Sequence, residues 1–419
     1  MRIRVSATDT DFSLLEKIAF CLYFMVEVNI ELFVNRPLYI FSALLLTIAL
    51  LGSGKAVFRV TLYTIWTFLW ALCVALSSIY SIAPSTTFTA VLTISARALV
   101  FFAIISRVQN YMLFEKMLKI LVFVEFLNVF YILSKINLFS GIQRIGFRSI
   151  DTDSDASWNS NAISSDLALC IMSLGALLHN GAIRRRGVSY LIIVMFAMVG
   201  LLCGSRMGML LIIGTPILWL FLSSDKTNRI KRLSLLVLLF IGAYFFVFEI
   251  PTIYNILGVR VERLIYSLMG QSVADISINE RSNLVMYGLA WFRQKPVFGY
   301  GMYTFKEKIG TALYGVNKYS HNNYVEILFG TGIVGFITYY WFYVYLLIKS
   351  FKNRYLYKHW AIVASGLIIL ALAEYATVSF KKFAFQFAIL LLFCVLKFDK
   401  SALIADLNEE PTLNNSESR

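Results

Sequence analysis

The residues best suited to chemistry are two arginines and one histidine, each in a short polar segment of an otherwise apolar chain. Arginine offers a planar, permanently charged fork that can grip phosphate oxygens, and a neutral imidazole can accept a proton from a hydroxyl group. Together they could hold an anionic substrate and activate a nucleophile beside it. The three are Arg206 in GSRMG, Arg281 in INERSNLVMYGLAWFRQKPVFGYG and His321 in YSHNNYVEILFGTGIVGF.

The elements that must hold these residues are membrane-spanning helices. Of the 419 residues, 59% are hydrophobic and 15% charged, whereas soluble domains are roughly half apolar and about 25% charged. Apolar runs long enough to cross a bilayer recur along the chain. The sequence therefore predicts an all-α polytopic membrane protein with about twelve spans. The expected spans are 12–34, 38–53, 60–80, 87–107, 112–134, 161–180, 187–204, 207–222, 233–250, 325–348, 359–378 and 383–398.

Lysine and arginine gather in alternate short connections, so the positive-inside rule predicts that both termini are cytoplasmic. We expect residues 1–398 to form one transmembrane domain and 399–419 a polar, disordered cytoplasmic tail. The connection 251–324 is much longer than the others and is expected to be an external helical loop between spans nine and ten.

The net charge of +14 is spread over these short clusters, so it fits membrane topology and does not indicate nucleic-acid binding. The five cysteines lie in apolar runs without the spacing of a zinc site. An acidic run at Asp151, Asp153 and Asp155 lies in a turn-rich loop and is interpreted as solvated. No metal and no cofactor are therefore predicted.

Arg206 is predicted to lie in a tight hairpin at the external membrane surface. A continuous helix over 187–222 would be about 54 Å long, well beyond a hydrocarbon core of about 30 Å, so the chain must turn near its middle. Residues 204–208 are the only polar break there. The guanidinium could hold a phosphate at headgroup level, or it could be an interfacial arginine that reaches lipid headgroups without further function.

Arg281 is predicted to face the packed side of a helix that stops at Pro296, before a turn through Gly299 and Gly301. A charge on an apolar face needs a partner, which could be a carboxylate in a structural ion pair or an anionic ligand. The stripe that it shares consists of Ile278, Arg281, Val285, Leu289 and Phe292.

His321 is predicted to stand in the first turn of the next span, with Ser320 as the N-cap. A helix N-terminus disfavours the imidazolium, which would leave His321 neutral and available as a general base. It could equally be a polar residue bonded to headgroups or water. By the topology count, His321 and both arginines lie on the external side.

The charged residues Arg97, Glu125 and Glu374 lie within apolar runs, and each could be functional or part of a buried pair.

At these three segments the sequence resembles the bacterial O-antigen ligase and O-antigen polymerase superfamily. The glycine-serine-arginine hairpin, the arginine-bearing helix with its proline and glycine-x-glycine turn, and the histidine-asparagine pair occur in the family order over about 160–345. The resemblance implies a metal-independent, inverting membrane glycosyltransferase that uses undecaprenyl-diphosphate-linked saccharides at the periplasmic face of the bacterial inner membrane. Arg206 and Arg281 would hold the diphosphate, and His321 would take the proton of the acceptor hydroxyl. Substrate contacts are expected from Ser205, Asn322 and Arg293.

The leading hypothesis is a polymerase that joins lipid-linked repeat units of a surface polysaccharide. It is favoured because RIGFRSIDTDSDASWNSN resembles an arginine-rich, aspartate-containing segment of family polymerases. The alternative is a ligase that transfers the polysaccharide to lipid A-core. A lipid-linked sugar flippase would commonly show repeated halves and discontinuous helices, which the sequence does not indicate, and a peptidoglycan polymerase would need an external aspartate, for which Asp275 is the candidate. The expected partners are the lipid-linked oligosaccharide, the acceptor, membrane lipids, and a chain-length regulator and flippase of the same pathway.

Overall fold

The all-α prediction is confirmed by the computed structural model, in which every regular element of the described residues is a helix. The loop with the acidic run and Asp275 lie outside the described residues. The structure describes residues 10–28, 36–135, 160–179, 181–183, 185–223, 229–269, 276–313, 318–352, 354 and 359–409.

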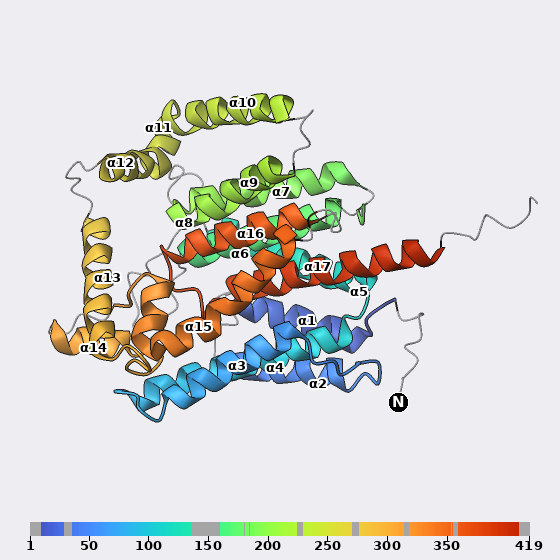
Figure 1. Cartoon of the computed structure of the whole chain (residues 1–419). Helices are drawn as coiled ribbons and strands as arrows, with labels where there is room; N and C mark the ends of the chain where they lie inside the picture. The colour runs from blue at the N-terminus through green and yellow to red at the C-terminus, as the bar shows by residue number, and fades with distance from the viewer. Residues whose placement is uncertain are drawn as a thin grey trace, which may run out of the picture.

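Each predicted span coincides with a helix or a helical segment (Figure 1). The main bundle contains α1 (Leu14–Glu27), α2 (Arg36–Leu51), α3 (Leu62–Ser77), α4 (Pro84–Arg107), α5 (Tyr111–Lys135), α6 (Ser160–His179), α7 (Arg186–Leu202), α8 (Arg206–Met209), η3 (Leu210–Gly214), α9 (Thr215–Leu222), α15 (Asn323–Lys352), α16 (Trp360–Glu374) and α17 (Phe383–Glu409). Among the described residues, α4, α5, α6 and α15 are long and apolar enough to cross a membrane, and six further apolar segments are shorter. The number of twelve spans stays a prediction.

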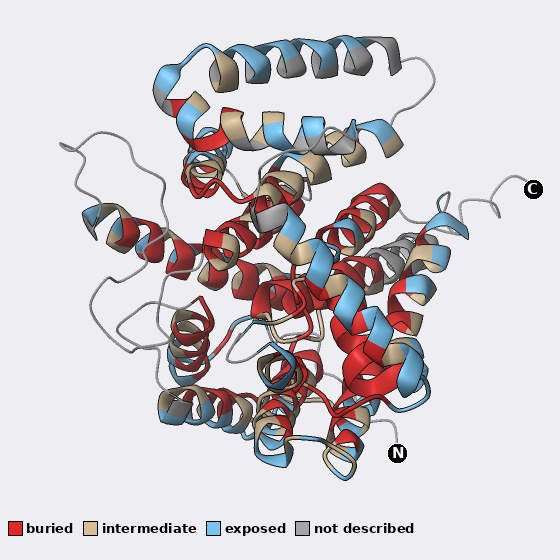
Figure 2. Cartoon of the chain, turned by 90° about the vertical axis from the view of Figure 1, so that its left-hand side faces the viewer, coloured by how far each residue is buried: buried red, intermediate tan, exposed pale blue. Residues whose placement is uncertain are grey.

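The connection 251–324 is largely helical where it is described. After α10 (Arg229–Phe248) come α11 (Pro251–Ile253), η5 (Tyr254–Gly258), α12 (Val259–Leu268), α13 (Ile276–Gln294) and α14 (Phe305–Ala312). In Figure 2, α10 and α12 lie at the edge of the molecule and carry many exposed residues, whereas buried residues concentrate in the packed helices. The external position of this connection stays a prediction.

Several turns gather at the end of the bundle where α8, α13 and α14 lie, opposite the last turns of α17 (Figure 1). We call this the motif end and define it by residues 203–206, 300–304, 318–322 and 375–382. Direct contacts join some of these turns to one another and to α3 and α4. For example, the backbone N–H of Met302 donates to Ser77 Oγ over 3.1 Å.

Two buried ion pairs fasten α1 to α4. Arg97 Nη2 lies 2.9 Å from Glu27 Oε2, and Arg107 Nε lies 2.5 Å from Glu16 Oε1. All four side chains are at most 5% exposed. Each buried charge thus has the opposite charge that a low-dielectric interior requires.

α15 is interrupted at Gly332, where φ is 63° and ψ is −161°. The turn at 296–301 fits into this break. Its N–H groups at Tyr300 and Gly301 donate to the carbonyls of Phe329 and Gly330 over 2.9 Å each. On the other side of the break, the N–H of Ile333 donates to the carbonyl of Pro296 over 2.9 Å. The backbone groups freed by the break are therefore satisfied by the turn.

Two expectations need correction. The absence of discontinuous helices was wrong, because the predicted span 325–348 contains the break at Gly332. The closely spaced Gly330, Gly332 and Gly335 were the available signal, but glycines are tolerated within a helical pattern and the apolar run predicts a continuous helix. The tail predicted to be disordered from residue 399 is helical as far as Glu409, because α17 continues past Phe398; residues 410–419 lie outside the described residues.

Candidate functional site

The segment that precedes α15 is fixed by its own side chains. Asn322 caps the helix, because its Oδ1 accepts from the N–H of Val325 over 3.1 Å. Ser320, expected as the N-cap, instead donates from Oγ to Glu326 Oε2 over 2.6 Å, and its N–H donates to the same oxygen over 3.0 Å. Asn322 thus takes the capping role expected of Ser320, whose hydroxyl binds Glu326 instead. The helix begins two residues later than predicted, so His321 lies before its first turn.

His321 is held in a conformation that few residues other than glycine adopt. Its φ is 56°, in the left-handed region. Its ring packs on Tyr319 with the ring centroids 4.1 Å apart. Among the described residues, no group hydrogen-bonds to its buried Nδ1. Backbone strain and a polar atom without a partner both cost stability, and such costs are typical of functional sites.

The imidazole of His321 is neutral at physiological pH. Its pKa is lowered from 6.5 to about 4, first by burial and next by the nearby Arg281 guanidinium, whose effect exceeds the opposing effect of the Glu280 carboxylate. The structure therefore brings Arg281 and His321 into electrostatic range of one another. The sequence also predicted a neutral imidazole, but it assigned the neutral state to a helix N-terminus. In the structure, desolvation and neighbouring cations lower the pKa instead.

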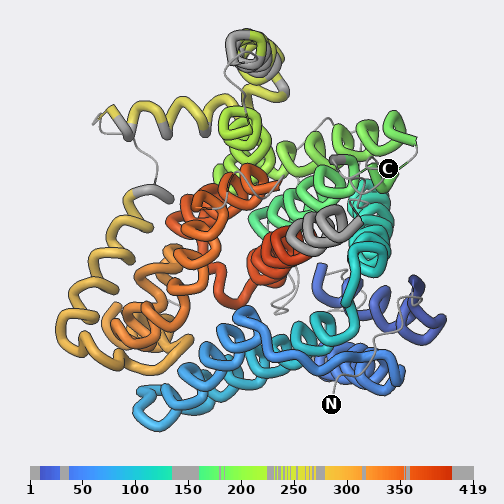
Figure 3. Tube along the Cα trace, turned by 45° about the vertical axis from the view of Figure 1, so that its right-hand side comes forward, coloured from blue at the N-terminus to red at the C-terminus, as the bar shows by residue number. Residues whose placement is uncertain are grey.

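α13, α14 and the first half of α15 lie side by side (Figure 3), and Arg281 is positioned by the small apolar core that they share. α13 approaches α15 closely at Gly288, where an added Cβ would lie 2.3 Å from a methyl carbon of Val325. Among the described side chains of α13, the buried positions are Leu284, Gly288 and Trp291, and Arg281 is half-buried one turn earlier. The predicted stripe is corrected at Leu289, which is exposed, because the packed face is centred on Gly288. The ammonium of Lys318 pairs with Glu280 and so ties the segment before His321 to α13.

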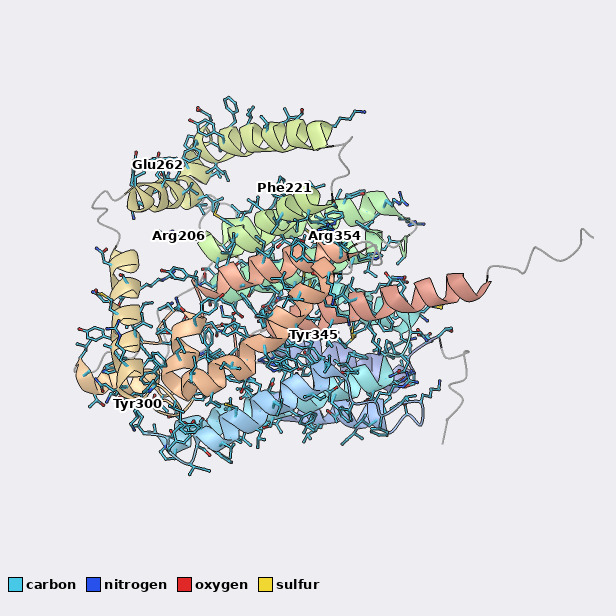
Figure 4. All side chains as sticks on the ribbon, in the orientation of Figure 1. Arg206, Phe221, Glu262, Tyr300, Tyr345 and Arg354 are labelled. Atoms are coloured by element: carbon cyan, nitrogen blue, oxygen red, sulfur yellow. The ribbon has the colours of Figure 1, made fainter. Side chains whose placement is uncertain are left out.

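Arg206 lies in the predicted hairpin between α7 and α8. The chain reverses at Gly204, with φ 60°, and Ser205 then caps α8 because its Oγ accepts from the N–H of Gly208 over 3.0 Å. The hydroxyl of Ser205 also donates to Asn161 Oδ1 over 2.6 Å. Figure 4 places Arg206 and Tyr300 at the motif end. The half-buried Arg206 thus shares this end with Arg281 and His321.

The three residues expected to contact substrate have different surroundings. Ser205 and Asn322 are 2% and 3% exposed, and both side chains serve as helix caps. Arg293 is exposed, but it lies twelve residues after Arg281, which is about 18 Å along a helix. Their substrate contacts stay predictions, and the structure gives Ser205 and Asn322 a structural role.

The structure adds two lysines that the sequence prediction missed. Lys381 Nζ donates to the hydroxyl of Tyr303 over 2.9 Å and lies 5.2 Å from the ring centroid of Tyr319, on which His321 packs. Lys382 Nζ donates to Thr377 Oγ1 over 2.7 Å. A pair of lysines between two apolar runs, in a connection expected to be external, was the available signal, because such connections are normally poor in lysine.

The loop that carries these lysines, residues 375–382, is held from several sides. Asn323 Oδ1 accepts from the N–H groups of Ser379 and Phe380 over 2.9 and 3.0 Å. Glu374 Oε1 accepts from Ser379 Oγ over 2.6 Å, and its carboxylate also accepts from the hydroxyls of Tyr340 and Tyr343 over 2.7 and 2.8 Å. Glu374, whose role was left open, is therefore a buried anchor.

Arg97 also supports this loop. Its Nη1 donates to the carbonyl of Lys381 over 2.9 Å and to Gln386 Oε1 over 3.3 Å, while its Nε and Nη2 bind Glu27. The open question about Arg97 is thus answered by a buried pair that holds the motif end. For Glu125, which is fully buried, the structure shows a bond to Asn128 over 3.3 Å and no link to His321.

A cavity of about 480 Å³ lies elsewhere, between α6, α7, α9 and α16. Its lining is mostly apolar and includes Met172, Ile193 and Trp219, with Arg186 among the polar members. None of the predicted site residues lines it. Among the described residues, no cluster of three or more His, Cys, Asp or Glu side chains has the arrangement of a metal site.

The arrangement can hold an anion and accept a proton at adjacent points. A neutral imidazole lies within electrostatic range of the guanidinium of Arg281 and the ammonium groups of Lys318 and Lys382. Cations so placed can stabilise negative charge that develops on a leaving group.

A family model described as O-antigen ligase matches residues 168–340. The match contains Arg206, Arg281 and His321, and it falls within the region predicted from the three motifs. A comparison with curated proteins finds no significant match. The order of the motifs, their meeting at one end of the fold and the family match agree. Residues 168–340 of this chain form a domain of the O-antigen ligase and O-antigen polymerase superfamily.

Proposed function

We propose that this protein is a membrane glycosyltransferase that joins saccharides carried on undecaprenyl diphosphate, with its active site at the motif end. The observation that supports the proposal is the effect of the Arg281 guanidinium on His321, whose lowered pKa keeps the imidazole neutral within the matched domain. The bacterial inner membrane, with the motif end facing the periplasm and both termini in the cytoplasm, is the corresponding location.

The reaction follows from the two charges that it must manage. The acceptor oxygen forms a bond to the anomeric carbon while the bond from that carbon to the diphosphate oxygen breaks. The diphosphate leaves with the electron pair, and the guanidinium groups of Arg281 and Arg206 stabilise its charge. The proton of the acceptor hydroxyl passes to the imidazole of His321. Attack opposite the leaving group inverts the anomeric centre.

Substrate binding would also strengthen the base. An imidazole with a pKa of about 4 is a weak base in the free protein. A bound diphosphate would offset the positive field of Arg281, Lys318 and Lys382, so the pKa of His321 would rise toward neutrality in the complex. The histidine would thus become an effective base only when the donor is in place.

We propose polymerisation of repeat units as the activity, with ligation to lipid A-core as the alternative. The segment that favours a polymerase, within 135–160, lies outside the described residues. A flippase is disfavoured because the break in α15 is filled by backbone hydrogen bonds from the 296–301 turn, which fixes it in place.

Complementation tests both the class and the activity. The chain is expressed in a polymerase-null and in a ligase-null bacterial strain, and surface polysaccharide is separated on a gel. Return of the length ladder in the first strain supports a polymerase, whereas decoration of the core in the second supports a ligase. His321→Ala is expected to abolish the activity, and Lys352→Met, which removes an exposed charge at the far end of α15, is the matched control. If lipid-linked substrate stays in the cytoplasmic leaflet of cells that carry His321→Ala, the result would indicate that the protein is a transporter.

A further inference from the structure

Lys381 and Lys382 lie at the motif end but belong to none of the three sequence motifs. Lys381 and His321 both contact the ring of Tyr319, because the ammonium is 5.2 Å from its centroid and the imidazole packs on it at 4.1 Å. Lys381 also lies 4.4 Å from the ring centroid of Tyr303, whose φ of 72° is again in the left-handed region. The lysine is thus held between two aromatic rings close to the proposed base.

The loop backbone is fixed independently of the lysine side chains. Arg97 binds the carbonyl of Lys381, and Asn323 binds the N–H groups of the two preceding residues. Gln386 donates to the carbonyl of Phe380. Because these contacts use backbone atoms, the two ammonium groups are positioned in advance, which lowers the entropic cost of binding a ligand.

The charges around His321 are mostly positive. The cations are Arg281, Lys318, Lys381 and Lys382. The acidic groups that act on them include Glu280, which pairs with Lys318, Asp166 of α6, which attracts Lys382, and the buried Glu326, which attracts Lys381. Burial and the neighbouring Lys381 and Arg281 lower the pKa of Lys382 to about 8, although Asp166 opposes this shift. Half-buried cations that repel one another are stabilised by an anion between them.

We propose that Lys381 and Lys382 bind the anionic group of the substrate and, with Arg281, complete one anion site around His321. The inference rests on the function proposed above, in which that group is the diphosphate of the lipid-linked donor. Two further donors suit a diphosphate, because it carries a negative charge on each phosphate group and its non-bridging oxygen atoms can each accept more than one hydrogen bond. Lys381 and Lys382 are substrate-binding residues in this account, and Arg97 and Asn323 are positioning residues.

Binding of farnesyl diphosphate to the full-length protein in lipid nanodiscs tests the proposal, with farnesol as the uncharged control. Lys381→Met and Lys382→Met are each expected to weaken farnesyl diphosphate binding by about tenfold, the effect of losing one charge-assisted hydrogen bond. Farnesol binding should not change. Lys352→Met should bind as the wild type does, because it changes the net charge equally without changing the motif end.

The inference would be overturned if Lys381→Met and Lys382→Met both bound farnesyl diphosphate with wild-type affinity. It would also be overturned if the wild-type protein bound farnesyl diphosphate and farnesol equally well. Thermal unfolding of each variant separates loss of binding from loss of fold. Tyr303→Phe removes the hydroxyl that binds Lys381 but keeps the ring, so a smaller loss of affinity is expected. If binding falls in the lysine variants while no transfer is ever observed, the anion site stands and the proposed function fails. If His321→Ala abolishes transfer and the lysine variants bind normally, the proposed function stands and the anion site fails.

Discussion

Arg97 donates a hydrogen bond of 2.9 Å to the carbonyl of Lys381, across 284 residues of sequence. The same guanidinium is paired with Glu27 at 2.9 Å, and both side chains are at most 5% exposed. The buried pair therefore extends from α1 through α4 to the loop that carries the two lysines. The stability of this ion pair and the geometry of the motif end therefore depend on the same guanidinium.

Breaking this pair should destabilise the protein strongly. Glu27→Gln leaves the charge of Arg97 buried without its carboxylate, which typically costs about 3–5 kcal/mol. Thermal unfolding of the purified protein in detergent measures the effect. Lys17→Met is the matched control, because it breaks an exposed pair with Asp11 that contributes at most about 1 kcal/mol. Equal losses in the two variants would contradict the account.

The pKa of His321 predicts an unusual pH dependence. Between pH 6.5 and about 4, His321 binds a proton more readily in the unfolded chain than in the folded protein. The contribution of His321 to the free energy of unfolding is therefore complete above pH 6.5 and is lost as the pH falls through about 4. The free protein should show an imidazole titration near pH 4 by NMR. Addition of inorganic pyrophosphate should move that titration upward, because the anion offsets the neighbouring cations.

Arg281→Gln should raise the pKa of His321, because it removes the largest cationic contribution to the shift. Arg293→Gln is the control, since this residue lies about 18 Å farther along the same helix. The imidazole titration reports both variants. An unchanged titration in Arg281→Gln, or equal shifts in the two, would show that Arg281 and His321 are not electrostatically coupled.

Gly332→Ala should disrupt the break in α15. A Cβ at this position would lie 2.2 Å from the carbonyl oxygen of Val297, and the φ of 63° is unfavourable for alanine. We expect a loss of at least about 2 kcal/mol in stability. Gly175→Ala, in α6 with no atom within 4 Å of the added carbon, should be neutral or slightly stabilising. A neutral Gly332→Ala would mean that the turn and the helix do not meet as described.

Arg206→Lys and Arg281→Lys test whether planar, bidentate contacts matter. Lysine keeps the positive charge but offers no fork, so each variant should reduce the turnover of lipid-linked donor by at least about tenfold. Steady-state transfer by protein in vesicles is the measurement. Near-normal turnover in both variants would remove these residues from the proposed site.

The helices and the three motifs could be predicted from the sequence because their signals are local. The hairpin at Gly204 followed from the length of the apolar run, and the end of α13 followed from Pro296. The neutral state of His321 was expected, but its cause was not, since burial and the field of Arg281 are tertiary effects. The cap was assigned to Ser320 because the sequence pattern did not show that Glu326, six residues later, accepts its hydroxyl and leaves Asn322 to cap the helix.

The missed features depend on contacts between distant segments. The break at Gly332 looks like continuous helix in sequence, because its hydrogen-bond partners are in the 296–301 turn. Lys381 and Lys382 looked like a short connection between spans, and contacts with distant residues such as Asn323 and Arg97 place them near His321. Arg97 itself could be recognised as unusual, but not paired, because Glu27 is 70 residues away.

The most direct test of the central claim is single-turnover transfer from a synthetic undecaprenyl-diphosphate repeat unit by the purified protein in vesicles. We predict that the wild-type protein forms the new glycosidic bond and that His321→Ala reduces the rate at least about a hundredfold, the usual contribution of a general base, while its thermal unfolding still shows a folded protein. A folded His321→Ala protein that transfers saccharide at the wild-type rate would contradict the assignment of His321 as the base.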